Sequence, residues 1–198
     1  MSTKEQELEI ELSDEDILDA MKHFEGYVDV FSDDFRAIYH HAHHHAVRRL
    51  TAGLKAEKLM RRNVPLLSPD LTLDLAAQTI VQSGYKGLPV VDPNGMVIGM
   101  LTETDFLRRL KVDTFLELLL NMMAGDYKLA HRCHDTPVGE AMTAGAVCVA
   151  VDAGFADIFR AFREHEGRSM PVVDATDRPQ GLILRKDFLS AAHLERLL

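Results

Sequence analysis

The sequence predicts an α+β fold in which one strand–helix–strand–strand–helix unit occurs twice, preceded by N-terminal helices. The first observation behind this prediction is a fixed offset, because residues 99–105 recur in outline at 181–187, 82 positions later. A run of identities at one offset indicates a duplicated supersecondary unit. The second observation is that apolar residues follow strand and helix periods in the same order in both copies. The first-copy residues that match at this offset are Met60, Pro89, Val90, Val91, Asp92, Gly99, Asp105, Phe106 and Leu107.

Two helices are expected before the repeats. Ser13 and Asp16 have the spacing of a capping box, and apolar residues follow them at helical spacing up to Gly26. Ser32, followed by two aspartates, repeats this start pattern, and its helix should run to about Thr51. We therefore assign residues 1–58 to an N-terminal helical extension.

Each strand and helix of the first copy is predicted from the residues of its own segment. Residues 64–68 are a short apolar strand, and 72–83 have apolar residues at helical spacing. Residues 88–91 and 96–102 are strands joined by Asp-Pro-Asn-Gly, whose Asn-Gly pair favours a tight hairpin. A last helix is expected over 103–110. The corresponding elements of the second copy are 147–151, 155–166, 170–173, 181–184 and 185–193.

These elements divide the rest of the chain into three parts. Residues 59–111 form the first repeat, and 137–198 form the second. Residues 112–136 form a helical linker, which contains an apolar helix near 114–123.

Composition excludes several classes of function. A net charge of −9 and a pI near 5.5 repel polyanions, so we expect no nucleic acid partner. Cys133 and Cys148 lack CxxC spacing, which argues against a disulfide framework or a thiolate zinc site. No signal peptide or membrane span is evident, so we expect a cytoplasmic protein without membrane contact. The motifs GxSxG, GxxxxGK[ST] and HExxH do not occur, so we predict no enzyme.

The second N-terminal helix has five histidines within six residues. His40 with His44, and His41 with His45, are i,i+4 pairs that lie one above the other on a helix. Each pair can offer two imidazoles to one divalent metal, but a third and a fourth ligand are missing. A solvated helix face or a subunit contact explains the same pattern. Both interpretations remain open.

The segment 99–105 places a glycine, a hydroxyl and a carboxylate where a strand turns into a helix. The carboxylate of Asp105 can accept two hydrogen bonds from a cis-diol, and free N–H groups at a helix start suit an anion. Gly99 lets the strand pass close to a ligand. The alternative interpretation is a capping interaction between Thr102 and Asp105. Leu184 replaces Thr102 in the second copy, so the two copies should behave unequally.

The two copies resemble a tandem pair of CBS domains, the regulatory module often called a Bateman module. The resemblance rests on residues 87–92 and 99–105 in the first copy and on 170–174 and 181–187 in the second, and it covers about 59–193. It implies two repeats packed through their sheets about a pseudo-twofold axis. It also implies two clefts that commonly hold AMP, ADP, ATP, NAD or S-adenosylmethionine, and a homodimer formed through the repeats.

Carried over by position, the resemblance implies a nucleotide site in the first repeat. Asp105 would accept bonds from the ribose hydroxyls, Thr102 would hold a phosphate, and the backbone near Gly87 would approach the base. The complete expected set is Leu66, Leu67, Gly87, Leu88, Pro89, Thr102 and Asp105. The residues of the second cleft would be Arg168, Ser169, Arg185, Lys186 and Asp187, and the basic residues among them could meet a phosphate chain.

The sequence and the resemblance together predict a stand-alone regulatory module that senses an adenosine-containing nucleotide in the cleft of the first repeat. The module would signal through its oligomer or a protein effector and would need no cofactor. Glu103 would repel a phosphate chain, which favours a monophosphate or a neutral adenosine. The alternative is a divalent-metal-binding or metal-sensing protein that uses the histidine-rich helix.

Overall fold

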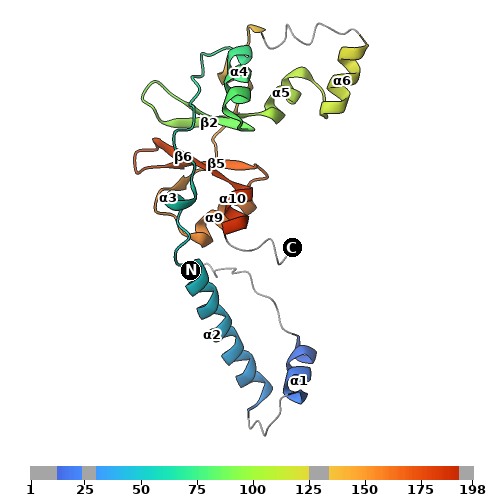
Figure 1. The fold of residues 1–198 in the computed structure, drawn as a ribbon, viewed down its shortest axis with the longest axis vertical. Helices are drawn as coiled ribbons and strands as arrows, with labels where there is room; N and C mark the ends of the chain where they lie inside the picture. Colours follow the sequence, from blue (N-terminus) through green and yellow to red (C-terminus); the bar gives the residue numbers. More distant parts are fainter. Residues whose placement is uncertain (1–12, 24–29, 125–133, 192–198) are drawn as a thin grey trace. The chain divides into compact units, whose positions relative to one another are not determined.

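The computed structural model describes residues 13–23, 30–124 and 134–191. The chain divides into two compact units, Met1–Gly53 and Leu54–Leu198. The first unit is helical, and the second contains two three-stranded sheets with helices around them (Figure 1). The predicted α+β class with N-terminal helices is confirmed.

The first unit consists of α1 (Asp14–Lys22) and α2 (Ser32–Thr51), which contact each other. The predicted capping box of α1 is confirmed, because the N–H of Ser13 donates to Asp16 Oδ2 at 2.9 Å and the N–H of Asp16 donates to Ser13 Oγ at 3.2 Å. This reciprocal pair satisfies two backbone groups that a helix start leaves free.

The predicted cap of α2 is wrong by one residue. Phe31 occupies the N-cap position with extended φ and ψ of −69° and 153°, and no side chain bonds to the free N–H groups there. Ser32 is already the first helical residue. Asp33 and Asp34 in the first turn still suit the positive end of the helix dipole, so the sequence pattern predicted the start of α2 to within one residue.

The first repeat has its sheet and helices in the predicted order. Strand β1 (Gly87–Val91) pairs antiparallel with β2 (Val97–Thr102), with Gly87 opposite Thr102. The strand expected at 64–68 is reduced to one parallel bridge between Leu67 and Val90. The elements are α4 (Leu73–Ser83), β1 (Gly87–Val91), β2 (Val97–Thr102) and α5 (Glu103–Leu110).

The second repeat has the same plan. Strand β4 pairs parallel with β5 at Val149 and Val172, which is the equivalent of the bridge from Leu67, and β5 pairs antiparallel with β6. In Figure 1 the two sheets are stacked, with the helices of each repeat on the outer sides. The elements are β4 (Val149–Ala150), α9 (Phe155–Glu164), β5 (Ser169–Val173), β6 (Pro179–Leu184) and α10 (Arg185–Ala191).

Each repeat begins with a short segment that pairs with the other repeat, and the sequence did not predict this exchange. After α3 (Ala56–Leu59), the N–H of Arg61 donates to Leu182 O at 2.8 Å, and the N–H of Leu182 donates to Arg61 O at 3.0 Å. After α8 (Val138–Ala141), strand β3 (Thr143–Ala144) joins the edge of β2. We call residues 56–61 and 138–144 the exchanged segments.

The exchanged segments also complete the hydrophobic cores. Ala56 and Met60 belong to the core of the second repeat, together with Ile158, Met170 and Phe188. Val138 in turn is fully buried in the core of the first repeat. Neither core is therefore built from one repeat alone.

The exchange explains two of the matched glycines. A Cβ on Gly99 would lie 2.7 Å from Thr143 O, and a Cβ on Gly181 would lie 2.6 Å from Arg61 O. Both distances are shorter than side chains tolerate, so the backbone of the exchanged segment requires glycine here. The close approach expected at Gly99 is thus made by the other repeat.

The predicted apolar linker helix, α6 (Phe115–Met123), lies between the two repeats in the sequence. Thr114 caps it by accepting the N–H of Glu117 at 3.1 Å. None of the helices in the described residues combines the length and the apolar character that crossing a membrane requires.

In the turn of each hairpin, β1–β2 and β5–β6, one aspartate accepts several hydrogen bonds. The N–H of Met96 and other donors of the turn lower the pKa of Asp92, which accepts that N–H at 2.8 Å. The hydroxyl and N–H of Thr176 lower the pKa of Asp174 in the same way, at 2.7 and 2.8 Å. These bonds stabilise the ionised form of both carboxyls.

Gly99→Ala or Gly181→Ala should lower the free energy of unfolding by about 1–3 kcal/mol, because the added methyl overlaps the backbone of the exchanged segment. Urea denaturation followed by circular dichroism measures this loss. Gly154→Ala is the control, since nothing lies within 4 Å of the Cβ it adds, and it should cost less than about 1 kcal/mol. Equal losses at all three positions would contradict the account.

Acid should destabilise the protein partly through the two turn aspartates. Their folded pKa lies below the unfolded value of about 3.9, so their contribution is present above that pH and is lost as the pH falls through the folded pKa. The double variant Asp92→Asn/Asp174→Asn keeps an oxygen acceptor at each turn and removes the titration. Its melting temperature should fall less than that of the wild type below about pH 4.

The control for this measurement is Asp70→Asn at an exposed position. It should follow the wild-type curve. If the melting temperature of the double variant falls as much in acid as that of the wild type, groups other than these two aspartates are responsible for the acid destabilisation.

Candidate functional site

The junction between β2 and α5 is centred on Asp105, whose side chain is fully buried. Thr102 donates its backbone N–H to Asp105 Oδ2 at 2.8 Å and its hydroxyl to the same oxygen at 2.7 Å. The other oxygen, Oδ1, accepts from Arg108 at 2.9 Å and from Thr143 Oγ1 at 2.8 Å. Asp105 therefore caps α5, and it also ties the first repeat to the exchanged segment of the second.

The equivalent junction, between β6 and α10 in the second repeat, also has an aspartate, but the partner of this aspartate from the exchanged segment is charged. Asp187 accepts from Arg61, with Nε to Oδ2 at 2.8 Å and Nη2 to Oδ1 at 3.2 Å. This contact raises the pKa of Arg61. Arg61 and Thr143 occupy matching positions in the two exchanged segments. From the exchanged segments, one junction aspartate thus meets a neutral hydroxyl, and the other meets a guanidinium in a bidentate pair.

The residues expected around a base separate into two groups. Leu66 is 45% exposed, and it lines a cleft of about 200 Å³ together with Pro89. Leu67 and Leu88 are at most 1% exposed and pack in the core, because successive residues of an extended chain point to opposite sides. Of Leu66 and Leu67, which were expected to form an apolar wall, only Leu66 lines the cleft. The cleft is lined by Asn63, Val64, Leu66, Pro89, Pro179, Gln180 and Gly181, so both repeats contribute to it.

Gly87 connects this cleft with the junction. It lies opposite Thr102 in the β1–β2 ladder, and a Cβ there would lie 2.8 Å from the Thr102 methyl carbon. Glycine thus makes room for the threonine at the start of α5. Thr102 and Asp105 do not themselves line the cleft.

Glu103 is not isolated at the junction. Its carboxylate pairs with Lys86 Nζ at 2.7 Å, and its N–H donates to Lys86 O at 3.1 Å. Both side chains are more than half exposed, so the pair adds little stability, but a cation stands beside the carboxylate. The repulsion that we expected between Glu103 and a phosphate is correspondingly smaller.

Arg185, which was expected to line a second cleft, is engaged in hydrogen bonds to backbone carbonyls. One guanidinium nitrogen, Nη2, donates to Phe162 O at 2.8 Å and to His165 O at 2.7 Å, and the guanidinium lies 4.9 Å from the centre of the Phe162 ring. It thereby satisfies carbonyls at the C-terminal end of α9, where positive charge is favourable. Sequence spacing could not indicate this contact, since the partners are 23 and 20 residues away.

The other residues expected in the second cleft have varied surroundings. Ser169 pairs with Leu184 in the sheet, and the carbonyl of Arg168 accepts the N–H of Arg185 at 2.8 Å. Lys186 is exposed. The structure does not gather these groups around one anion-binding point within the described residues.

The histidine pairs of α2 lie on one continuous helix, as predicted. Tyr39 lies against the rings of His40 and His43, with centroids 6.0 and 5.8 Å away. Across the described ranges, no three His, Cys, Asp or Glu side chains are placed to hold a metal ion. The pairs His40–His44 and His41–His45 thus supply two ligands each, and metal binding stays a hypothesis.

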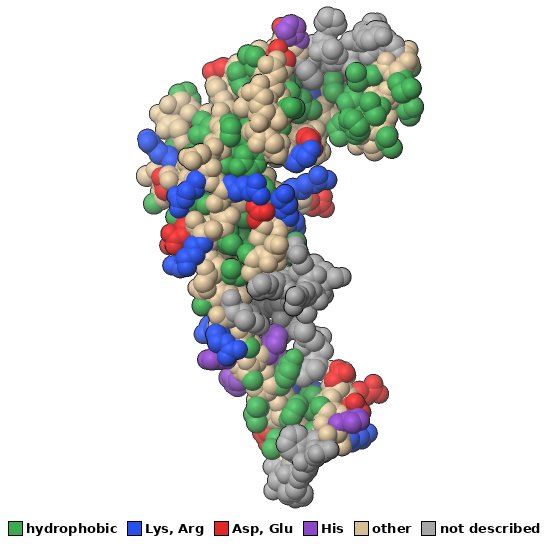
Figure 2. Space-filling model, in the orientation of Figure 1, with side chains coloured by type: hydrophobic (Ala, Val, Ile, Leu, Met, Phe, Trp, Pro, Cys, Tyr) green, Lys and Arg blue, Asp and Glu red, His purple; other side chains and the backbone are tan. Residues whose placement is uncertain are grey.

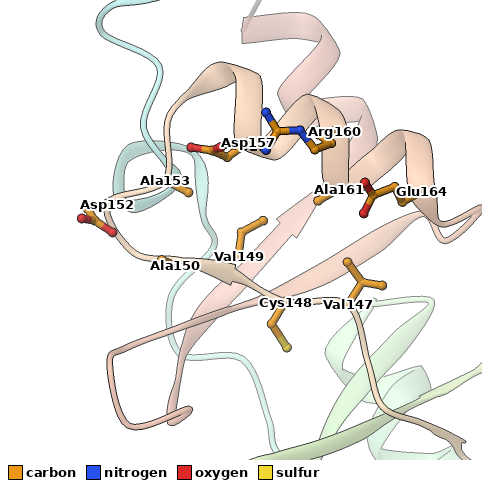
Figure 3. Close-up of a pocket in the computed structure, with 10 residues that line it drawn as sticks. All are labelled: Val147, Cys148, Val149, Ala150, Asp152, Ala153, Asp157, Arg160, Ala161 and Glu164. Carbon is orange, nitrogen blue, oxygen red and sulfur yellow. Dashed lines mark hydrogen bonds and ion pairs between the residues drawn. The ribbon is translucent and has the colours of Figure 1, made fainter. Parts of the chain in front are cut away.

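A larger pocket of about 390 Å³ lies between β4 and α9, and the sequence did not predict it. Figure 3 shows Asp157, Arg160 and Glu164 along α9 on one side and Cys148 on the other. Burial raises the pKa of the Cys148 thiol to about 11, so this thiol is protonated at neutral pH and is a poor nucleophile. The lining also contains Val147, Val149, Ala150, Asp152, Ala153 and Ala161.

Comparison with known proteins agrees with this architecture. The model of the CBS domain family matches residues 56–112 and 138–194. A curated relative is the CBS domain-containing protein CBSX2, chloroplastic, from Arabidopsis thaliana, which is 28% identical over 142 residues. That alignment covers 67% of this chain and 60% of the relative, so the chain spans less than two thirds of the relative's length.

Solved structures give the same result. The crystal structure of the CBS-pair protein CBSX2 from Arabidopsis thaliana superposes with a TM-score of 0.59 at 27% identity, covering 74% of this chain and 99% of that one. A crystal structure of CBSX2 in complex with AMP has a TM-score of 0.54 at 25% identity, covering 73% of this chain and 99% of that one. Since the family model matches two segments that make up more than half of the sequence, the chain belongs to the CBS domain family and contains a tandem pair of these domains.

Proposed function

We propose that this chain is a regulatory module that binds an adenosine-containing nucleotide at the first repeat and signals through its oligomer or a protein effector. The observation that supports this most directly is the continuity of the site. Pro89, which lines the cleft together with Leu66, lies on β1 with Gly87, and Thr102 lies opposite Gly87 at the end of β2, where it bonds to Asp105. A related CBS-pair protein, CBSX2, has been crystallised in complex with AMP.

The parts of the site suit the parts of such a ligand. Leu66 and Pro89 offer an apolar surface to a base. Lys86 supplies a cation at the start of α5, where a phosphate would lie, while the capping bonds between Thr102 and Asp105 already occupy part of this helix end. Asp105 supplies the carboxylate for the ribose hydroxyls.

Asp105 also links ligand binding to the contact between the two repeats. Both of its oxygens are engaged, so a ribose can bind there only by sharing or replacing the bonds from Arg108 and Thr143. The bond from Thr143 joins the two repeats. Ligand binding therefore acts on the contact between the repeats, and it favours the arrangement that binds the ligand more tightly.

The second repeat should bind the same ligand less well. A ribose at Asp187 has to displace a bidentate guanidinium, and Leu184 supplies no hydroxyl. We propose that one nucleotide binds per chain, at the first repeat.

Titration calorimetry with AMP, ADP, ATP, NAD and S-adenosylmethionine tests the site. At least one compound should bind to the wild type, and Leu66→Trp should weaken its affinity at least about tenfold because the indole fills the cleft. Leu75→Trp is the matched control, since Leu75 in α4 is 47% exposed and lies outside the cleft lining. It should bind like the wild type.

Absence of binding by every compound would overturn the proposed function. Equal weakening by both tryptophan variants would show that the cleft at Leu66 is not the site.

The inequality of the two repeats is tested by Asp105→Asn and Asp187→Asn. Asparagine retains one oxygen acceptor and loses the charge that strengthens bonds from hydroxyl groups. Asp105→Asn should weaken binding about tenfold or more, whereas Asp187→Asn should leave the affinity unchanged. Thermal melting of both variants checks that the module remains folded. The opposite ranking would place the nucleotide in the second repeat.

A further inference from the structure

Helix α6 has an unusual amount of exposed apolar surface. It lies outside both segments that match the CBS family, and none of its nine residues is buried. Figure 2 shows its hydrophobic side chains gathered into one cluster. The exposed fractions are 63% for Phe115, 70% for Leu116, 38% for Leu119, 66% for Leu120, 52% for Met122 and 84% for Met123.

These six side chains share one face of the helix. At about 100° per residue they occupy an arc of roughly 160°, while the half-buried Leu118 and Asn121 lie on the other side. An arc of this width is broader than the seam of a two-stranded coiled coil, and it is typical of a helix packed inside a bundle. We call these six residues the α6 face.

The size of the α6 face fits a protein interface. Its exposed fractions amount to roughly 700 Å² of surface, above the 300–600 Å² of the largest patch on a typical monomer. A standard interface buries about 800 Å² on each partner. Two α6 faces packed together therefore come close to the area that a stable dimer needs.

Charge favours a second copy of the chain over a membrane surface. The α6 face has no charged residue, so two copies meet without like charges in the contact. The one charged residue within α6 is acidic, Glu117, which accepts the N–H of Asp113 at 2.8 Å, and the chain as a whole has a net charge of −9. Helices that lie on anionic bilayers have basic polar faces, which α6 lacks.

We propose that the α6 face is a self-association surface, on which two copies of this chain pack their α6 helices against each other about a twofold axis. Such an isologous contact uses the same patch on both subunits. It lies outside the CBS repeats and does not depend on nucleotide binding.

The experiment compares the full chain with the double variant Leu116→Asp/Leu120→Asp by sedimentation equilibrium over a range of concentrations. Both positions are at least 66% exposed in the single chain, so the variant should fold, which circular dichroism verifies. Two charges in the centre of the contact should raise the dissociation constant at least about 100-fold, and the assembled mass should halve. Val81→Asp, at a 78% exposed apolar residue of α4, is the matched control and should retain the wild-type mass.

The melting temperature gives an independent reading. It should rise with protein concentration for the wild type and not for the double variant, because association stabilises the folded chain by mass action. Equal masses of wild type and double variant would overturn the proposal. So would cosedimentation of the wild type, and not the variant, with phosphatidylcholine–phosphatidylserine vesicles while both have the same mass, which would assign the α6 face to a bilayer.

Discussion

The exchange of short segments between the two repeats is the contact on which the rest of the larger unit depends. Each segment adds backbone hydrogen bonds to the other repeat's sheet, as Arg61 does with Leu182. Each also buries apolar side chains in the other repeat's core, as Ala56 does. Glycines at 99 and 181 are needed because these segments pass so close. Sheet pairing, core packing and backbone geometry are thus satisfied jointly by two halves of one chain.

The same exchange also contacts the two junction aspartates. These are the carboxylates for which a ribose contact was expected, and each accepts a bond from the exchanged segment of the other repeat. From the exchanged segments, Asp105 accepts from the Thr143 hydroxyl and Asp187 accepts from the Arg61 guanidinium, while Asp105 also accepts one bond from Arg108 of its own repeat. Under the proposed function, a ribose at Asp105 competes with two single bonds, whereas a ribose at Asp187 competes with a bidentate ion pair. The exchanged segments thus give the two aspartates unequal partners.

Much of this architecture could be predicted from the sequence, and the reasons differ from element to element. The 82-residue offset and the local periods indicated the strands and helices, because both depend on neighbouring residues. The capping box at Ser13 was equally local. The exchange was not predictable, since a match of Met60 with Met142 reveals equivalence and not partnership. The engagement of Arg185 with the end of α9 was missed for the same reason: its partners are remote in the chain.

The interlocked repeats make each half of the chain incomplete by itself. A single repeat, taken alone, has a core that lacks the apolar residues of the other repeat's exchanged segment and a sheet edge that lacks the backbone pairing of that segment. Two identical repeats that completed each other in this way would present the same residue to both junction aspartates. Because the two repeats of this chain differ in sequence, Arg61 and Thr143 stand at the matching positions, and the surroundings of Asp187 and Asp105 are unequal.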